Sequence, residues 1–324
     1  MRNLCSNLPH YGAGNDTNPL YNAAQGYPAV CVGAGPSLSK NVHLLANPEV
    51  RRNVVLIAAQ TTLKPLLDRG IRPDFVTALD YHEISKRFYD GLPELPDVTL
   101  VAEPLAHWSI LDSFPGPVCV SQSRILDQLI GKLAKPIINV PYGATVAHLS
   151  FYLAQHLGCD PIITIGQDLG FTDGLYYSPG TAYHEVWAPE LNAFNTIEMM
   201  EWQRIVRHRS HLQKAKDIHG RDIYTDEQMI TYLKQFEKDF AQATQQVIDA
   251  SEGGQPKKFS TRMSLQEALD KYAVRPIPAW PALPRELDAD RLAESEKVLR
   301  DTLEQITELR RNSVKVLPLL KQMR

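Results

Sequence analysis

The sequence predicts an α/β protein whose core is a doubly wound, mostly parallel sheet of the Rossmann type, followed by a helical C-terminal region. Two observations support this. Short apolar runs, typical of strands buried on both faces, alternate with amphipathic helical stretches between residues 29 and 165. Nearly every run is followed by a glycine or a polar side chain, as expected where parallel strands end at a ligand-binding edge. The predicted strands are Ala29–Val32, Val54–Ala59, Phe75–Leu79, Thr99–Ala102, Val118–Val120, Ile137–Val140 and Ile162–Ile165.

Length and composition define the remaining organisation. The chain has 324 residues, more than one minimal domain needs. Helical patterns over Thr196–Ala215 and Asp226–Ser251 follow the sheet, and four prolines then predict an extended linker before a helix from Asp288 to Leu320. The expected segments are an irregular leader (1–27), a Rossmann-like nucleotide-binding domain (28–194), a helical extension that completes the site (195–273), and a proline-rich linker with a C-terminal helix (274–324).

Charge and cysteine content exclude several classes of function. The net charge of −3 argues against a general electrostatic grip on nucleic acid. No apolar run approaches the ~20 residues that cross a bilayer, and no signal-peptide pattern opens the chain, so we expect a cytoplasmic protein. The four cysteines form no C-x-x-C pair, so neither a zinc site nor a redox motif is indicated.

The stretch from residue 29 to residue 38 predicts a buried strand that ends in a glycine turn and opens a helix. Gly33 and Gly35 lack the Cβ atoms that would keep a phosphate away from the backbone. Pro36 fixes φ near the helix entrance, and Ser37 can cap the helix. Because free N–H groups at a helix start bind anions, we predict that this turn holds the phosphate of a nucleotide. A tight turn without a ligand is the alternative.

The same turn departs from the best-known nucleotide motifs. Leu38 occupies the place of the third glycine in a dinucleotide fingerprint, and the second strand ends at Gln60 without an acid for a ribose hydroxyl. The chain also lacks the G-K-[ST] of a Walker-type ATPase. Both NAD and Walker-type ATP binding are therefore disfavoured.

Residues at the strand exits are the other candidates for the site. Asp80 and Asp168 each follow a buried run directly, and Asp168 lies in an unusually polar context. After Asp168 the periodicity stops, and Gly170–Pro189 predicts a long loop or lid that carries Tyr176, Tyr177 and His184. The expected nucleotide-binding residues are Gly33, Gly35, Pro36, Ser37, Leu38, Gln60, Thr61, Asp80, Gly143, Thr145, Gly166 and Gln167.

The C-terminal helix carries a separate pattern. Leu292, Leu299 and Ile306 recur every seven residues. This spacing predicts either a helix docked on its own domain or the contact of a homodimer.

Four sequence blocks together resemble a known family. They are Gly33–Leu38, Ile71–Asp80, Gly158–Leu169 and Ala250–Gly254. In this order they are similar to the domain shared by motility-associated factor (Maf) flagellin glycosyltransferases and archaeal 6-hydroxymethylpterin pyrophosphokinase. The glycine turn and the later Gly-x-Asp block also resemble CMP-dependent bacterial sialyltransferases, which have a GT-A-like Rossmann fold and need no metal for catalysis.

The resemblance implies a glycosyltransferase that moves a nonulosonic acid, of sialic, pseudaminic or legionaminic type, from a CMP-activated donor to a protein Ser/Thr acceptor such as flagellin. Maf proteins usually carry a large N-terminal domain that is not seen before the motif here, which leaves the acceptor open. For such a transfer we expect His184 as the general base and the hydroxyls of Tyr176 and Tyr177 as donors to the leaving phosphate. Asp168 would contact donor or acceptor, and Glu252 is the other candidate acid or base.

Two other functions compete with this interpretation. One is ATP-dependent 6-hydroxymethylpterin pyrophosphokinase, which would need Mg²⁺, held by Asp80 and Asp168. The other is a non-catalytic module that binds a nucleotide sugar. Under the preferred interpretation no cofactor is expected, and the partners are a nucleotide sugar and a protein acceptor.

Overall fold

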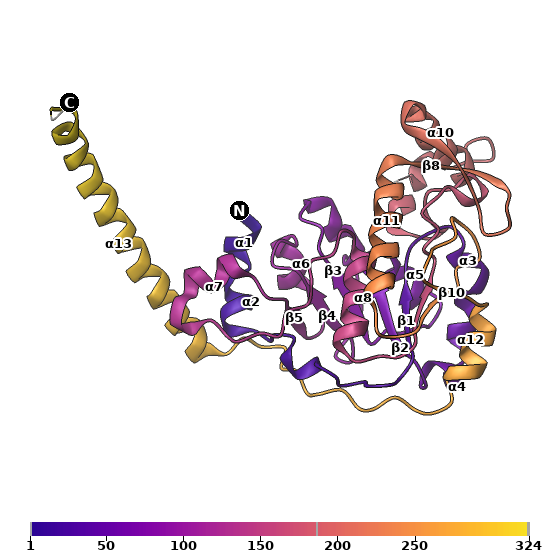
Figure 1. The fold of residues 1–324 in the computed structure, drawn as a ribbon, viewed down its shortest axis with the longest axis horizontal. Helices are drawn as coiled ribbons and strands as arrows, with labels where there is room; N and C mark the ends of the chain where they lie inside the picture. Colours follow the sequence, from indigo (N-terminus) through magenta and orange to yellow (C-terminus); the bar gives the residue numbers. More distant parts are fainter. Residues whose placement is uncertain (1, 186, 323–324) are drawn as a thin grey trace.

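A computed structural model describes residues 2–185 and 187–322, and its centre is an eight-stranded sheet (Figure 1). All strand pairs are parallel, and the order is β10-β9-β6-β1-β2-β3-β4-β5. The chain runs outward from β1 to β5 and then returns to place β6 on the other side of β1. The predicted doubly wound fold is therefore confirmed. The strands are β1 (Ala29–Val32), β2 (Val55–Ala59), β3 (Phe75–Ala78), β4 (Thr99–Ala102), β5 (Val118–Val120), β6 (Ile162–Ile165), β9 (Val247–Asp249) and β10 (Thr261–Arg262).

Helices cover both faces of the sheet because alternate strand residues point in opposite directions. Val30 and Val32 pack into one apolar core, whereas Ala29 and Cys31 pack into the other. The first core includes residues of α3 (Leu38–Asn41), α5 (Leu63–Leu67), α6 (Trp108–Ser113) and α12 (Leu265–Tyr272). The second includes residues of α8 (Val146–His156) and α11 (Glu227–Gln242). Two further short helices are α4 (Pro48–Arg51) and α9 (Ala182–Glu185).

The N-terminal segment is more regular than predicted. Instead of an irregular leader, residues 1–27 contain α1 (Arg2–Ser6), α2 (Leu8–Ala13) and a 3-10 turn at Asn18–Leu20. Helix α2 packs against β5 and α7 (Arg124–Ile130). Buried Leu4 and Tyr11 give this segment its place in the first core.

The predicted strand at Ile137–Val140 is wrong. The edge of β5 is already taken, because Asn15 forms an isolated bridge to Cys119 there and its carbonyl accepts the N–H of Val120. Ile137 instead packs into the first core and Val140 into the second. An apolar run whose members bury on opposite sides gives the same sequence signal as a buried strand.

The predicted helix Thr196–Ala215 ends early. Helix α10 (Ile197–Arg207) is capped by Thr196, and a short turn then leads into an antiparallel hairpin of β7 (Leu212–Lys216) and β8 (Asp222–Asp226). The Asp217 carboxylate makes the hairpin turn by accepting the N–H groups of His219 and Arg221. The helix expected over Thr196–Ala215 is therefore divided between a helix and a strand.

The predicted helix Asp226–Ser251 is also shorter. Asp226 caps α11 by accepting the N–H of Met229 at 2.7 Å, and the helix ends at Gln242. Val247 and Ile248 then pair with β6 as part of β9. Their branched side chains are buried in the sheet, which favours a strand over a helix here.

The proline-rich linker is extended, as predicted, and lies against the body. Trp280 donates its indole N–H to Asp74 at 3.0 Å and packs edge-on to Phe75. The linker leads to α13 (Ala289–Gln322), which contacts α2 and α7 and then projects away from the rest of the chain (Figure 1). Leu303, Ile306 and Leu309 are exposed there. No helix in the described part of the chain has the length and apolarity to cross a membrane.

Candidate functional site

The sheet and its loops enclose a cavity of about 300 Å³ where the strand order reverses between β1 and β6. We call it the switch-point cavity. Its floor is formed by the turns after β1 and β6, and its sides by the start of α8 and the start of α11. Ligands of open α/β sheets bind at this position, outside the carboxyl ends of the strands.

Eleven of the predicted site residues line this cavity: Gly33, Gly35, Pro36, Thr61, Asp80, Thr145, Gly166, Gln167, Asp168, Tyr176 and Tyr177. Six do not: Ser37, Leu38, Gln60, Gly143, His184 and Glu252. The strand exits therefore meet at one edge, as expected. The chemical roles assigned to them stay predictions.

The glycine turn after β1 is not a set of free amide donors. The N–H of Gly33 binds the carbonyl of Ile165 at 2.9 Å, and that of Gly35 binds the carbonyl of Gly166 at 2.7 Å. The N–H of Ser37 lies 3.2 Å from each carboxylate oxygen of Asp168. Within the described residues, Ala34 alone among the non-proline residues at 33–38 keeps an N–H without an acceptor. The predicted phosphate clasp at this turn is therefore largely occupied by the protein itself.

The two glycines are required by close packing. A Cβ on Gly33 would lie 2.7 Å from the carbonyl oxygen of Gly166, and one on Gly35 would lie 2.2 Å from Asp168 Oδ1. Such distances are shorter than any van der Waals contact. The glycines let the turns after β1 and β6 touch, which brings Asp168 beneath the start of α3.

Asp168 is a buried structural carboxylate, 1% exposed. Ser37 Oγ donates to it at 2.7 Å and Thr172 Oγ1 at 2.5 Å. Burial raises its pKa, and the hydrogen bonds from Thr172 and Ser37 oppose that rise. Because its oxygens are already bonded within the protein, this geometry disfavours Asp168 as a contact of donor or acceptor, and its role stays a prediction.

The block Ala250–Gly254 packs beneath the same carboxylate. A Cβ on Gly253 would lie 2.8 Å from Asp168 Oδ2, and one on Gly254 would lie 2.0 Å from the Asp168 carbonyl oxygen. Ser251 Oγ accepts the N–H of Gln167 at 3.1 Å. Glu252 lies in this loop, after β9 rather than at a helix end, and lines none of the cavities described here. Its block supports the floor of the site.

The start of α8 supplies the free amides that the first turn lacks. Thr145 caps this helix, and its hydroxyl accepts the N–H of His148 at 3.3 Å. The N–H groups of residues 144–147 have no acceptor within the described chain, and these residues line the cavity. An 11-residue helix adds a partial positive charge at this end. Anion binding is therefore favoured here, at the second small-residue turn that the sequence singled out.

Two buried side chains, His148 and Glu103, form hydrogen bonds that fix the start of α8. Burial lowers the pKa of His148 to about 4, so its ring is neutral and can pair with the Thr145 hydroxyl at 2.8 Å. Glu103, at the exit of β4, accepts the N–H of Gly143 at 2.7 Å. Burial raises the pKa of Glu103 to about 7. Glu103 was not among the predicted site residues. Its position directly after the apolar run Thr99–Ala102 could have identified it, as it did for Asp80 and Asp168.

Asp80 is the carboxylate that lines the cavity on the β3 side. The side-chain amide of Gln60 donates to it, which explains why Gln60 itself is buried. Burial raises the pKa of Asp80, and His82 and the Gln60 hydrogen bond oppose that rise. Asp80 can therefore accept a hydrogen bond or a proton more readily than an exposed aspartate.

The predicted lid forms the upper wall of the cavity through three tyrosines. The rings of Tyr177 and Tyr183 are stacked at 4.7 Å, and Tyr176 lies 4.7 Å from Tyr177. Burial raises the pKa of Tyr176 to about 12, so its hydroxyl stays protonated and can donate a hydrogen bond. The guanidinium of Arg204, from α10, lies 4.5 Å from the centre of the Tyr176 ring.

His184 belongs to the support of the lid. Its Nε2 pairs with Glu201 Oε1 at 2.8 Å, and the other oxygen of Glu201 accepts the N–H of Tyr176 at 2.7 Å. Both side chains are buried, Glu201 completely. Because His184 is enclosed and lines neither the switch-point cavity nor its neighbour, the structure disfavours it as a base for an acceptor hydroxyl.

The residues do not fit a magnesium site. The described residues bring no three His, Cys, Asp or Glu side chains together in a metal-binding group. Of the two predicted carboxylates, Asp168 is bonded to Ser37 and Thr172, and Asp80 to Gln60.

Comparisons with known proteins place the fold among solved structures. A solved structure, the Maf glycosyltransferase from Magnetospirillum magneticum AMB-1, matches 92% of this chain with a TM-score of 0.58 and 17% sequence identity. This chain spans 42% of the length of that protein. A search of curated proteins returns no match.

A protein-family model covers more than half of the chain. It is described as 6-hydroxymethylpterin diphosphokinase MptE-like and matches residues 2–174, from α1 to the beginning of the lid. The match includes the glycine turn, Asp80, the start of α8 and Asp168. The chain therefore belongs to the MptE-like family, and its fold is that of the Maf glycosyltransferase structure.

Proposed function

We propose that this chain transfers a sugar from a nucleotide-activated donor to an acceptor hydroxyl, without a metal ion. The proposed donor is a CMP-activated nonulosonic acid, and the proposed acceptor is a protein Ser/Thr such as one in flagellin. The observation that carries the proposal is the start of α8, where unpaired amides line a cavity at the switch point of the sheet. The cavity's volume of about 300 Å³ lies at the lower end of the range for small-molecule sites.

The proposed chemistry uses the two walls of the cavity. The acceptor oxygen attacks the anomeric carbon, the bond from that carbon to the donor's phosphate oxygen breaks, and the phosphate leaves with the electron pair. The amides of Val146 and Ala147 and the hydroxyl of Tyr176 are suited to receive this negative charge. The acceptor's proton must pass to a base, and Asp80 is the cavity carboxylate whose raised pKa suits that task.

Diphosphoryl transfer to a hydroxymethylpterin is the second candidate, because the matching family model carries that description. That model ends at residue 174, so most of the tyrosine lid and all of α10 and α11 lie outside it. The likeness to the Maf glycosyltransferase covers 92% of the chain and must extend well beyond this point. The upper wall of the cavity therefore favours the sugar-transfer proposal.

A proline substitution tests the anion site without disturbing the helix. Val146 is the first residue of α8, where proline is tolerated and its missing N–H is not needed by the helix. Thr145 already has the extended backbone that proline requires of its predecessor. We expect Val146→Pro to weaken CMP binding about tenfold to a hundredfold, by removing one charge-assisted hydrogen bond. Isothermal titration calorimetry with CMP, in the absence of Mg²⁺, gives the affinity.

The matched control is Arg124→Pro, the same change at the first position of α7, whose cap Ser123 is also extended. This control should bind CMP as the wild type does. CMP binding that Val146→Pro leaves unchanged would contradict the anion site. Binding of ATP that requires Mg²⁺, with no binding of CMP, would support the diphosphokinase instead.

A further inference from the structure

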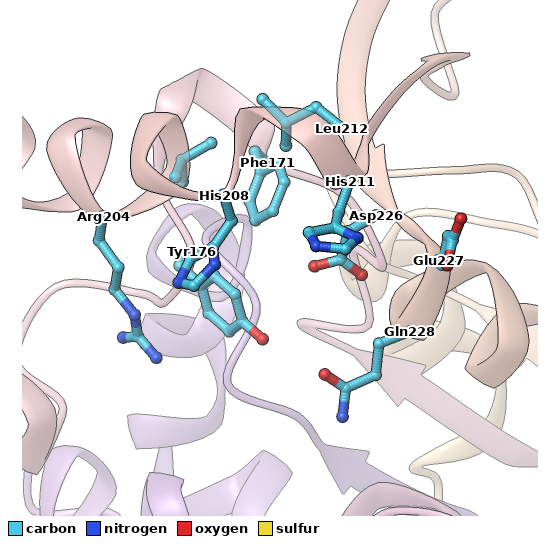
Figure 2. Close-up of a pocket in the computed structure, with 10 residues that line it drawn as sticks. Phe171, Tyr176, Arg204, His208, His211, Leu212, Asp226, Glu227 and Gln228 are labelled. Atoms are coloured by element: carbon cyan, nitrogen blue, oxygen red, sulfur yellow. The ribbon is translucent and has the colours of Figure 1, made fainter.

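A second cavity, of about 410 Å³, is lined by the residues drawn in Figure 2 and shares two of them with the switch-point cavity. We call it the α10 cavity; it lies between the lid, α10 with the turn Arg209–His211, and the junction of β8 with α11. Tyr176 and Gln228 line both cavities. A ligand whose two parts are joined by a covalent bond could therefore occupy both cavities, crossing between these two side chains.

One wall of the α10 cavity carries a positive charge that the protein leaves without a carboxylate. Arg204 lies over three rings, at 4.5 Å from Tyr176, 5.6 Å from Tyr177 and 5.5 Å from Tyr183. In residues 2–185 and 187–322, no carboxylate oxygen lies within 4 Å of its guanidinium. Glu201, one helical turn away, is committed to His184 and Tyr176. The stack fixes the direction of a planar cation, a good partner for a carboxylate.

The opposite wall has acceptors for hydroxyl groups. Figure 2 shows Asp226 and Gln228 across the cavity from Arg204 and Tyr176. One oxygen of Asp226 accepts the N–H of Met229, which leaves the other oxygen for a ligand. Phe171 and Tyr176 add aromatic surface 5.5 Å apart, centre to centre. Aromatic surface for an apolar ring face, polar acceptors for hydroxyls and one oriented cation together fit a sugar that bears a carboxylate.

We propose that the α10 cavity binds the carboxylated sugar of the nucleotide donor, with Arg204 pairing with its carboxylate and Asp226 accepting a hydroxyl. This assignment rests on the proposed function, which puts the nucleotide in the adjoining cavity. The sugar is bonded to the nucleotide's phosphate, so it must lie in a space next to the phosphate site. Residues from beyond position 174 provide both the cation and the carboxylate, so this specificity lies outside the MptE-like match.

The experiment compares two probes, CMP and CMP-N-acetylneuraminic acid, by isothermal titration calorimetry. In the wild type we expect the sugar-bearing probe to bind at least tenfold more tightly than CMP. Arg204→Gln should abolish this gain and leave CMP affinity within about twofold. Arg207→Gln is the matched control, since Arg207 lies on the same helix but does not line the α10 cavity. The Arg207→Gln variant should still bind CMP-N-acetylneuraminic acid at least tenfold more tightly than CMP.

A second variant covers the case in which loss of Arg204 disturbs the tyrosine stack. Asp226→Asn retains an oxygen that can cap α11 and removes only the charge. We expect it to reduce the gain several-fold, with unchanged CMP affinity. If CMP binds but the gain is absent in the wild type, or persists in both variants, the sugar assignment is overturned and the proposed function stands. If CMP does not bind at all, both are overturned.

Discussion

Two buried carboxylates support opposite walls of the switch-point cavity, and their partners differ in kind. Asp168, beneath the floor, binds Ser37, which is 131 residues away in the chain and follows a neighbouring strand. Glu201, above the lid, binds Tyr176 and His184, which are 25 and 17 residues away. The first joins two parts of the main sheet, whereas the second joins only the lid to α10. The floor should therefore resist opening until the whole domain unfolds, and the lid should open locally.

The largest expected effect comes from breaking the floor. Asp168→Ala leaves the Ser37 and Thr172 hydroxyls and the Ser37 N–H without their buried acceptor. We expect the free energy of unfolding to fall by about 3–5 kcal/mol, since one side of a buried, fully bonded network is lost. Urea denaturation followed by circular dichroism measures this change.

Asp168→Asn is the companion variant, because its amide oxygen can still accept one of these hydrogen bonds. It should lose less stability than Asp168→Ala. A normally stable Asp168→Ala protein that had lost only donor hydrolysis would return Asp168 to a chemical role and remove the contrast with Glu201.

Changing Glu103 should have an effect on stability smaller than that of Asp168 and larger than that of Glu201. Glu103 is held by a single hydrogen bond, from the backbone N–H of Gly143, in the described chain. Burial raises its pKa from the usual 4.5 to about 7. Between these values the folded protein holds a proton that the unfolded chain has released, so stability falls as pH rises through this window. The loss is at most about 3 kcal/mol and is complete above pH 7.

The variant Glu103→Gln removes this titration and keeps an oxygen for the Gly143 N–H. Denaturation midpoints at pH 5 and pH 8 should show a smaller decrease for the variant than for the wild type. Equal decreases in both proteins would mean that Glu103 is charged throughout.

The sheet could be predicted because each of its central strands is a mainly apolar run that is buried throughout, as in Val55–Ala59. The same rule failed at Ile137–Val140, where the apolar residues enter two different cores. It also missed β7, because the largely exposed residues Leu212–Lys216 carry no strand alternation and follow on from the helical pattern that begins at Thr196. Hairpin strands outside the core depend on local turn bonds, here those of Asp217.

The strand exits predicted which edge of the sheet holds the candidate site, but they did not predict which of its residues bind each other rather than face the cavity. A polar residue after a buried strand gives one signal whether it binds a ligand or a neighbouring turn. Asp168 and Ser37 meet only because the chain returns to β1 after 131 residues. His184 similarly meets Glu201 only through the fold of the lid onto α10. Such contacts depend on tertiary structure, and no local pattern in a single sequence reports them.

Of the three carboxylates, Glu201 should have the smallest effect on global stability. Its replacement is the most direct test of the contrast between the floor and the lid of the cavity. Glu201→Ala removes the acceptor for the Tyr176 N–H and for His184, both within the lid. Because the lid can open without the sheet, we expect the unfolding free energy to change by less than about 1 kcal/mol. Amide hydrogen exchange over residues 175–185 should nevertheless accelerate by about tenfold or more, whereas exchange in β1 and β6 should stay as in the wild type. Equal acceleration in the lid and in the sheet would mean that the two carboxylates support one cooperative unit, and the distinction between floor and lid would be lost.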